Sequence, residues 1–141
     1  MPQFSALNAT RQTIIAACVA LADTPNARRV GLLKHERLEL GQGLFIPGRS
    51  WLPLMAIHTF GMKFTIDVIF FDNNHHVLRL GTIHPNRIVW ARGARGVLEL
   101  AQGAIAGSQT RLGDKIELIE PQISNQGGGN KTEDSPIPSI I

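Results

Sequence analysis

The segment Phe64–Phe71 constrains the fold of this chain more than any other part of it. It consists almost entirely of aromatic and β-branched residues, a composition that favours a β-strand. Successive side chains of a strand point to opposite faces, so Ile66 and Val68 share one face and Ile69 lies on the other. Both faces are apolar, which predicts an interior strand buried on both sides. Asp67 would then lie in mid-strand, where a carboxylate is costly unless it is paired or hydrogen-bonded.

Length and composition predict one compact globular domain over residues 1–120. The chain has 141 residues, of which 43% are hydrophobic, enough for an ordinary core. Residues 121–141 hold a glycine triplet, prolines and polar residues, and this composition predicts a disordered C-terminal tail. The net charge of +3 is too small to indicate a nucleic-acid-binding protein unless the charges cluster.

Shorter elements are expected on either side of the central strand. Thr24 and Pro25 are typical of a helix start and predict a helix over residues 25–35. A tight hairpin turn is expected at residues 72–75, a single helical turn within 101–107, and loops at residues 49–55 and 85–95. Further short strands are predicted at residues 4–8, 44–46, 77–83, 96–100 and 115–119.

The apolar run Thr13–Leu21 fits two structures when it is considered alone. Its alanines suit a buried helix, whereas its isoleucines, valine and threonine suit a buried strand, and periodicity cannot separate the two in so short a run. The residues by themselves favour the helix slightly. Cys18 lies in this run, has no other cysteine to pair with, and is expected to be a small buried hydrophobic residue.

Several motifs in consistent order resemble the bacterial and archaeal family called domain of unknown function 192. The most specific is an Ile-His-Thr, Met, Ile-Asp, Phe pattern, found here as Ile57-His58-Thr59, Met62, Ile66-Asp67 and Phe70. Accompanying matches are Thr24 with Arg28 or Arg29 before Gly31-Leu32, Gly43-Leu44-Phe45, Val97-Leu98-Glu99-Leu100 with Gly103, and Gly113-Asp114.

This resemblance implies an α+β, mostly β fold, with a compact antiparallel or mixed sheet or partly closed barrel and one clear helix. It also implies that Thr13–Leu21 is a strand of that fold. Similar sequences often carry a cysteine three residues before the Ile-His-Thr isoleucine, and Leu54 stands there in this chain. A thiol role at that position is therefore absent. The family's activity is unsettled, so the resemblance implies a fold rather than a function.

A set of polar residues embedded in apolar strands defines the candidate site. In the functional interpretation they form a polar pocket at the end of the central strand, and the chain is a small soluble binding or accessory domain. In the structural interpretation, Asp67 accepts backbone hydrogen bonds and His58 is a satisfied core histidine. The candidate binding residues are His58, Thr59, Asp67, Arg95 and Glu99.

Two alternatives stay open at this point. The chain could be a small hydrolytic enzyme with His58 as general base, oriented by Asp67 or Glu99. Alternatively, the arginines of residues 87–95, with Trp90 among them, could bind nucleic acid or another anion, although a solvated loop is the more ordinary explanation.

No nucleophile elbow, phosphate-binding loop or closely spaced metal-ligand pair accompanies these residues, so neither a metal nor a cofactor is expected. The expected partner is a small anionic or polar ligand or another protein, and nucleic acid is the less favoured partner. No apolar run reaches the length of about 18 residues that a membrane helix needs, and no secretion signal is recognisable, which predicts a cytoplasmic protein without a membrane partner. The oligomeric state does not follow from the sequence.

Overall fold

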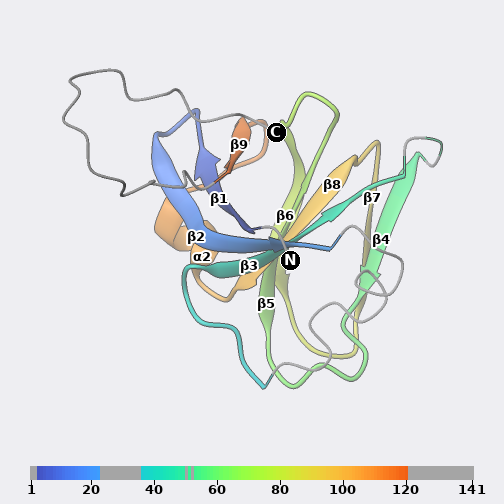
Figure 1. Ribbon diagram of the computed structural model, residues 1–141. Helices are drawn as coiled ribbons and strands as arrows, with labels where there is room; N and C mark the ends of the chain where they lie inside the picture. Colours follow the sequence, from blue (N-terminus) through green and yellow to red (C-terminus); the bar gives the residue numbers. More distant parts are fainter. Residues whose placement is uncertain (1–2, 23–35, 50, 52, 121–141) are drawn as a thin grey trace, which may run out of the picture.

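The computed structural model describes residues 3–22, 36–49, 51 and 53–120, and it is a mostly β structure with one short described helix (Figure 1). The first strands are β1 (Gln3–Asn8), β2 (Thr13–Leu21), β3 (Gln42–Pro47), β4 (Leu54–His58) and β5 (Ile66–Phe71). They are followed by β6 (Val77–Ile83), β7 (Ile88–Arg92), β8 (Gly96–Ala101), the helix α2 (Ala104–Ser108) and β9 (Ile116–Ile119).

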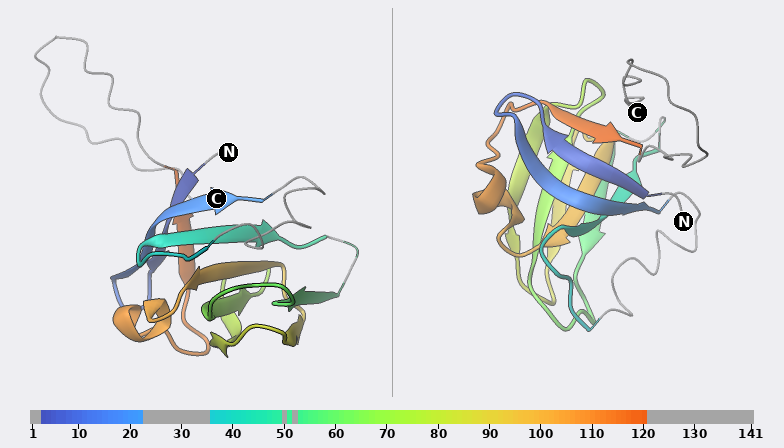
Figure 2. Two further views of the ribbon diagram at one scale, coloured as in Figure 1. Left: turned by 90° about the horizontal axis from the view of Figure 1, so that it is seen from below. Right: turned by 60° about the vertical axis from the view of Figure 1, so that its left-hand side comes forward.

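Seven of these strands form one sheet in the order β6-β5-β8-β3-β2-β1-β9, in which only β2 and β3 pair in parallel. The sheet curls until its two edge strands meet at one corner (Figure 2). There His76 and Lys115 form an isolated antiparallel bridge, and the N–H of Ile116 donates to the carbonyl of His75 at 2.8 Å. The sheet is therefore a partly closed barrel.

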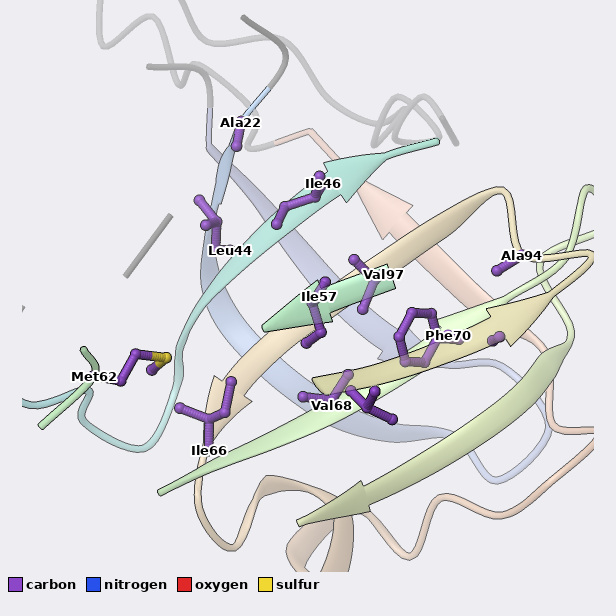
Figure 3. Close-up of a cluster of buried hydrophobic side chains, with 12 residues drawn as sticks. Ala22, Leu44, Ile46, Ile57, Met62, Ile66, Val68, Phe70, Ala94 and Val97 are labelled. Atoms are coloured by element: carbon purple, nitrogen blue, oxygen red, sulfur yellow. The ribbon is translucent and has the colours of Figure 1, made fainter. Parts of the chain in front are cut away.

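The remaining strands, β4 and β7, form a separate two-stranded sheet that we call the ribbon. It covers one face of β5 and β8, where Ile57 of β4 and Val89 of β7 pack with Val68, Phe70 and Val97 (Figure 3). We call this cluster the ribbon-side core. It lies between the seven-stranded sheet and the ribbon.

The opposite face of β5 and β8 contributes to a second cluster, which we call the inner core. It contains Ile69 of β5 and Leu98 of β8, together with side chains from β1, β2 and β9. Because these strands come from both halves of the sheet order, the inner core fills the concave side of the curled sheet. All six residues of β5 are buried, as predicted for an interior strand with two apolar faces.

The predicted α+β, mostly β fold class is confirmed, and so is the strand over Thr13–Leu21 that the family resemblance implies. β2 hydrogen-bonds to β1 on one side and to β3 on the other. The slight preference for a helix, drawn from the residues alone, is therefore wrong, because strand pairing on both edges outweighs the helix propensity of the alanines. The helix predicted at residues 25–35 lies outside the described residues, as does the predicted tail.

Two local predictions are wrong. The stretch 85–95 is not only a loop, because it contains β7, which pairs with β4 along its whole length. Cys18 is exposed rather than buried, and its thiol donates to Oε1 of Gln3 at 3.1 Å. Ala17 next to it is exposed as well, so an apolar sequence run does not imply burial of each member.

Candidate functional site

Asp67 lies within β5, and both of its carboxylate oxygens accept hydrogen bonds. Oδ1 accepts from the hydroxyl of Thr82 on β6 at 2.7 Å. Oδ2 accepts from the backbone N–H groups of Gly103 and Ile105 at 3.1 and 3.0 Å. These N–H groups belong to the first turn of α2, where backbone donors have no partner within the helix. Asp67 is 2% exposed, and its bonds tie α2 to the sheet.

Thr59 is fully buried directly after β4 and makes several bonds to the segment before β7. Its hydroxyl donates to the carbonyl of His84 at 2.7 Å and accepts from the N–H of Arg87 at 2.9 Å. Its own N–H donates to the carbonyl of Arg87 at 2.8 Å. Thr59 therefore joins the two strands of the ribbon at one end, since β4 ends just before it and β7 begins just after Arg87.

Glu99 lies on β8, opposite Leu44 of β3 and Val68 of β5, and its side chain is on the ribbon-side face. It is 5% exposed, and its Oε2 atom has no hydrogen-bond partner among the described residues. Burial raises the pKa of Glu99 to about 7, because an apolar environment penalises the charged form. Near neutral pH this carboxyl group is therefore poised between its protonated and ionised forms.

His58 is the last residue of β4, and its imidazole is exposed. Its neighbours Ile57 and Thr59 are buried, so the alternation of the strand turns His58 away from the ribbon-side core. The imidazole stacks on Phe60, with 5.4 Å between ring centroids and 28° between ring planes. Arg95 precedes β8, and its Nη1 donates to the carbonyl of Arg49 at 3.3 Å.

The structure does not bring His58, Asp67 and Glu99 into one pocket. Asp67 shares the inner-core face of β5 with Ile69, whereas Glu99 opposes Val68 and lies on the other face. His58 faces away from both cores. Arg95 is also distant from Asp67. The residue after Arg95, Gly96, opposes Phe71, and Phe71 lies four residues, or about 13 Å along β5, from Asp67. The binding role of each residue stays a separate prediction.

A different surface, which sequence reasoning missed, gathers exposed side chains on the outside of the ribbon. Register pairs Leu54 with Arg92, Ala56 with Trp90, and His58 with Ile88, and all six residues are exposed. We call these six residues the outer ribbon face. Ile88 is 64% exposed and Trp90 is 52% exposed. Two large apolar side chains are therefore exposed to solvent on a strand pair whose other side is packed in the core.

The signal for this surface was present in the sequence. Residues 88–92 read Ile-Val-Trp-Ala-Arg, a short run with strand composition between Pro85 and Gly93. The prolines, glycines and arginines around the run favoured a loop, and five residues are too few for a strong alternation signal.

The sequence segments that contain the ribbon carry charged side chains of a single sign. No Asp or Glu occurs in residues 40–66 or 73–98, which contain both ribbon strands and the segments next to them. These stretches contain Arg92 on the outer ribbon face and Arg49, whose guanidinium lies 6.0 Å from the ring centroid of Trp51. Lys63 of the first segment is ion-paired with Glu36, and the remaining cations of these segments favour an anionic partner over a cationic one.

Among the residues that the structure describes, no group of three or more His, Cys, Asp or Glu side chains could hold a metal ion. In the same part of the chain, no helix is long and apolar enough to cross a membrane.

The curled sheet, the covering ribbon and the buried carboxylates together define a class of small, mostly β domain. The family model DUF192, described as "Uncharacterized ACR, COG1430", matches residues 6–118, and the chain belongs to this family. This chain is 30% identical over 112 residues to a UPF0127 protein of Thermococcus sibiricus, and the match covers 79% of this chain and 72% of that protein. It is 35% identical over 101 residues to the UPF0127 protein PH1112 of Pyrococcus horikoshii, covering 70% of this chain and 85% of that protein.

Two crystal structures have a similar fold. One is a candidate transcription regulator (R01717) from Sinorhizobium meliloti 1021, with a TM-score of 0.71 and 17% identity over 83% of this chain and 92% of that chain. The other is a protein of unknown function from Novosphingobium aromaticivorans, with a TM-score of 0.68 and 18% identity over 82% of this chain and 83% of that chain. At these identities the likeness establishes the fold alone.

Proposed function

We propose that this chain is a binding domain without catalytic activity, and that the outer ribbon face docks an acidic polypeptide segment with apolar or aromatic side chains. The observation that carries this proposal is the exposure of Ile88 and Trp90 on a strand pair whose opposite side is packed against the core. Exposed apolar patches of this kind often mark sites of protein–protein contact. Aromatic residues and arginine are also enriched in such interfaces.

Charge identifies the kind of partner. Residues 40–66 and 73–98, which form and flank the ribbon, contain six arginine and lysine residues and no carboxylate, and one of the six, Lys63, is ion-paired with Glu36. A partner rich in Asp and Glu would meet a complementary field, and a basic partner would be repelled. Leu54, Ile88 and Trp90 would supply the apolar contacts, with Arg92 and His58 at the edge of the same face.

The hydrolytic alternative has less support. Both oxygens of Asp67, its candidate orienting carboxylate, already accept hydrogen bonds, from Thr82 and from the first turn of α2. His58 stacks on Phe60 on the opposite side of the ribbon from Glu99. A general base needs its orienting group within hydrogen-bond reach, and neither carboxylate meets that condition.

The test uses arrays of defined peptides rather than an unidentified partner. Acidic peptides with one or two leucine or phenylalanine residues are compared with peptides in which every Asp and Glu is replaced by Lys. We expect saturable binding of acidic peptides that weakens as salt increases. Ile88→Ser and Trp90→Ala should each reduce it about tenfold or more, which is the effect expected for interface anchors.

Ile14→Ser is the matched control, because Ile14 is 66% exposed on β2, away from the ribbon. This variant should bind the acidic peptides as the unaltered protein does. Equal losses in Ile14→Ser and Ile88→Ser would overturn the proposed surface. Binding only to single-stranded oligonucleotides, with no acidic peptide retained, would instead favour the nucleic-acid alternative suggested by Trp90 and the nearby arginines.

A further inference from the structure

A small cavity lies between the edge strand β6 and the ribbon strand β7. It has a volume of about 80 Å³ and is lined by Val68 and Phe70 of β5, Arg79, Gly81 and Ile83 of β6, and Val89 of β7. This volume holds several water-sized groups. Leu80 also contributes to the lining, and among the lining side chains only that of Arg79 is charged. The cavity is separate from the outer ribbon face, because Val89 belongs to the packed side of the ribbon.

Gly81 needs an explanation that the rest of the fold does not supply. Glycine weakens a strand interior, and it usually occurs there because of a special backbone conformation or a close approach. Gly81 does not have a positive φ, and a Cβ atom added to it would meet only Cδ1 of Ile83, at 4.0 Å. The other glycines of the described strands differ: an added Cβ would lie 2.8 Å from Leu100 at Gly43 and 2.5 Å from Phe71 at Gly96.

The absence of a side chain at Gly81 therefore keeps the cavity open without serving the packing of the described chain. Gly81 opposes Val68 in the β5–β6 register, so a side chain there would project from the same face into the cavity. A glycine at such a position is typical of a place where a ligand approaches the backbone closely.

Arg79 supplies the polar end of this cavity. It lies two residues before Gly81 on the same face of β6, and its side chain is exposed. Its Nη1 donates to the carbonyl of Trp90 at 2.7 Å, which holds the guanidinium across the gap between β6 and β7. A guanidinium group carries five N–H donors. One of them is bonded to the carbonyl of Trp90, and the remaining donors can bind an anion.

We propose that this cavity binds a short unbranched aliphatic carboxylate, with its alkyl chain over Gly81 and its carboxylate on Arg79. The apolar side chains of the lining fit the alkyl chain, the single cation fits a monoanionic head, and the volume limits the ligand to a small molecule. This proposal does not depend on the docking of a peptide at the outer ribbon face.

The test is an NMR titration of the full chain with sodium hexanoate, followed through the backbone amide signals. We expect saturable shifts confined to the amides of Val68, Gly81, Val89 and their neighbours. Hexylammonium carries the opposite charge on the same chain and should bind at least tenfold more weakly. Shifts that are not saturable, or that are spread over the surface, would overturn the proposal, as would equal binding of hexylammonium.

Four variants complete the test. Gly81→Val fills the cavity with a residue that strands favour, so it should remain folded and lose hexanoate binding. Gly81→Ala is the smaller replacement to use should Gly81→Val fail to fold, and it should weaken binding. Arg79→Gln should weaken hexanoate binding about tenfold while leaving the affinity for hexanol unchanged. Arg92→Gln removes the same charge from the outer ribbon face and should bind hexanoate normally. Unchanged binding in both Gly81→Val and Arg79→Gln, or an equal loss in Arg92→Gln, would rule out this site.

Discussion

The side-chain amide of Asn8 donates a hydrogen bond to Oδ2 of Asp114 at 2.9 Å, so the end of β1 is bonded to the turn that precedes β9. The same amide donates to Oγ1 of Thr110 at 3.1 Å, and Nε of Arg11 donates to Oδ2 of Asp114 at 2.7 Å. Burial by itself would raise the pKa of Asp114. The hydrogen bonds that Asp114 accepts from Asn8, Arg11 and the N–H of Arg111, together with the charge of Arg11, outweigh that effect and hold the pKa of Asp114 below its ordinary value.

Asn8→Ala should lower the free energy of unfolding by about 1–3 kcal/mol, because it removes a donor from two buried acceptors. Urea unfolding at neutral pH measures the loss. The contribution of Asp114 is fully present above its unfolded pKa, near 3.8, and is lost as the pH falls through its lower folded pKa. In Asp114→Asn this part of the acid destabilisation should be absent. A loss below about 0.5 kcal/mol in Asn8→Ala would contradict a structural role for this bond.

Asp67→Asn and Asp67→Leu should each destabilise the protein by about 1–3 kcal/mol, since both leave donors of Thr82 or α2 without an acceptor. Hydrogen exchange adds a local measurement. The amides of Gly103 and Ile105 should exchange faster in Asp67→Leu than in the unaltered protein. Unchanged stability and unchanged exchange at these amides would point away from a structural carboxylate and towards a functional one.

Glu99→Gln should remove a pH dependence of stability between about pH 4.5 and pH 7. The folded pKa of Glu99 is raised from 4.5 to about 7, so across this range the folded state binds more protons than the unfolded state. Stability therefore falls as the pH rises through this window, by about 3 kcal/mol in total.

Urea unfolding of both proteins at pH 5 and pH 8 checks this prediction. The two proteins should have similar stability at pH 5, and the glutamine variant should be the more stable one at pH 8. Parallel pH profiles for the two proteins would show that the Glu99 carboxylate ionises in the folded state as readily as in the unfolded state.

Gly96→Ala and Gly81→Ala should have opposite effects although both glycines lie in strands. A Cβ at position 96 would stand 2.5 Å from Cζ of Phe71 and 2.8 Å from Cε2 of Phe45, whose rings stack at 5.7 Å. We expect a loss of about 1–3 kcal/mol there from overpacking. At position 81 the added methyl group meets only Cδ1 of Ile83, at 4.0 Å, so stability should stay the same or increase. Thermal unfolding of the two variants makes the comparison, and equal losses would contradict it.

A chain ending at Pro121 should keep the melting temperature of the full chain within a few degrees. The composition of residues 122–141 offers too little apolar surface to offset the entropy of ordering them. A fall of more than about 10 °C would show that these residues pack on the domain, because 1 kcal/mol corresponds to only a few degrees at this size.

The sequence predicted the central strand well because β5 is buried on both faces and therefore carries apolar residues at every position but one. The exception, Asp67, was correctly identified as needing partners. Its bonds to the first turn of α2 span more than 30 residues, a separation that no local pattern reveals. The run Thr13–Leu21 shows the same limit, since its strand structure depends on pairing with β1 and β3 rather than on its own propensity.

The candidate site was harder to predict, because residues on different faces of a sheet can be near neighbours in the sequence. Asp67 and Val68 are adjacent in the chain. Glu99 opposes Val68, so the side chains of Glu99 and Asp67 lie on opposite faces of the sheet. A single-residue change in the assumed register would have placed the two carboxylates together. The ribbon was missed for a related reason: β7 has five residues, and its partner β4 lies more than 30 residues earlier.

The pairing of β1 with β9 has a consequence for the synthesis of the protein on the ribosome. Ser5 pairs with Ile119 and Asn8 pairs with Ile116, so within this domain β1 is translated more than 100 residues before its partner β9. Contacts between such distant segments slow folding, because a long loop must close before they can form. Until β9 has emerged, the edge of β1 that β9 covers has no partner strand, and an unpaired edge of this kind can pair with other chains and aggregate.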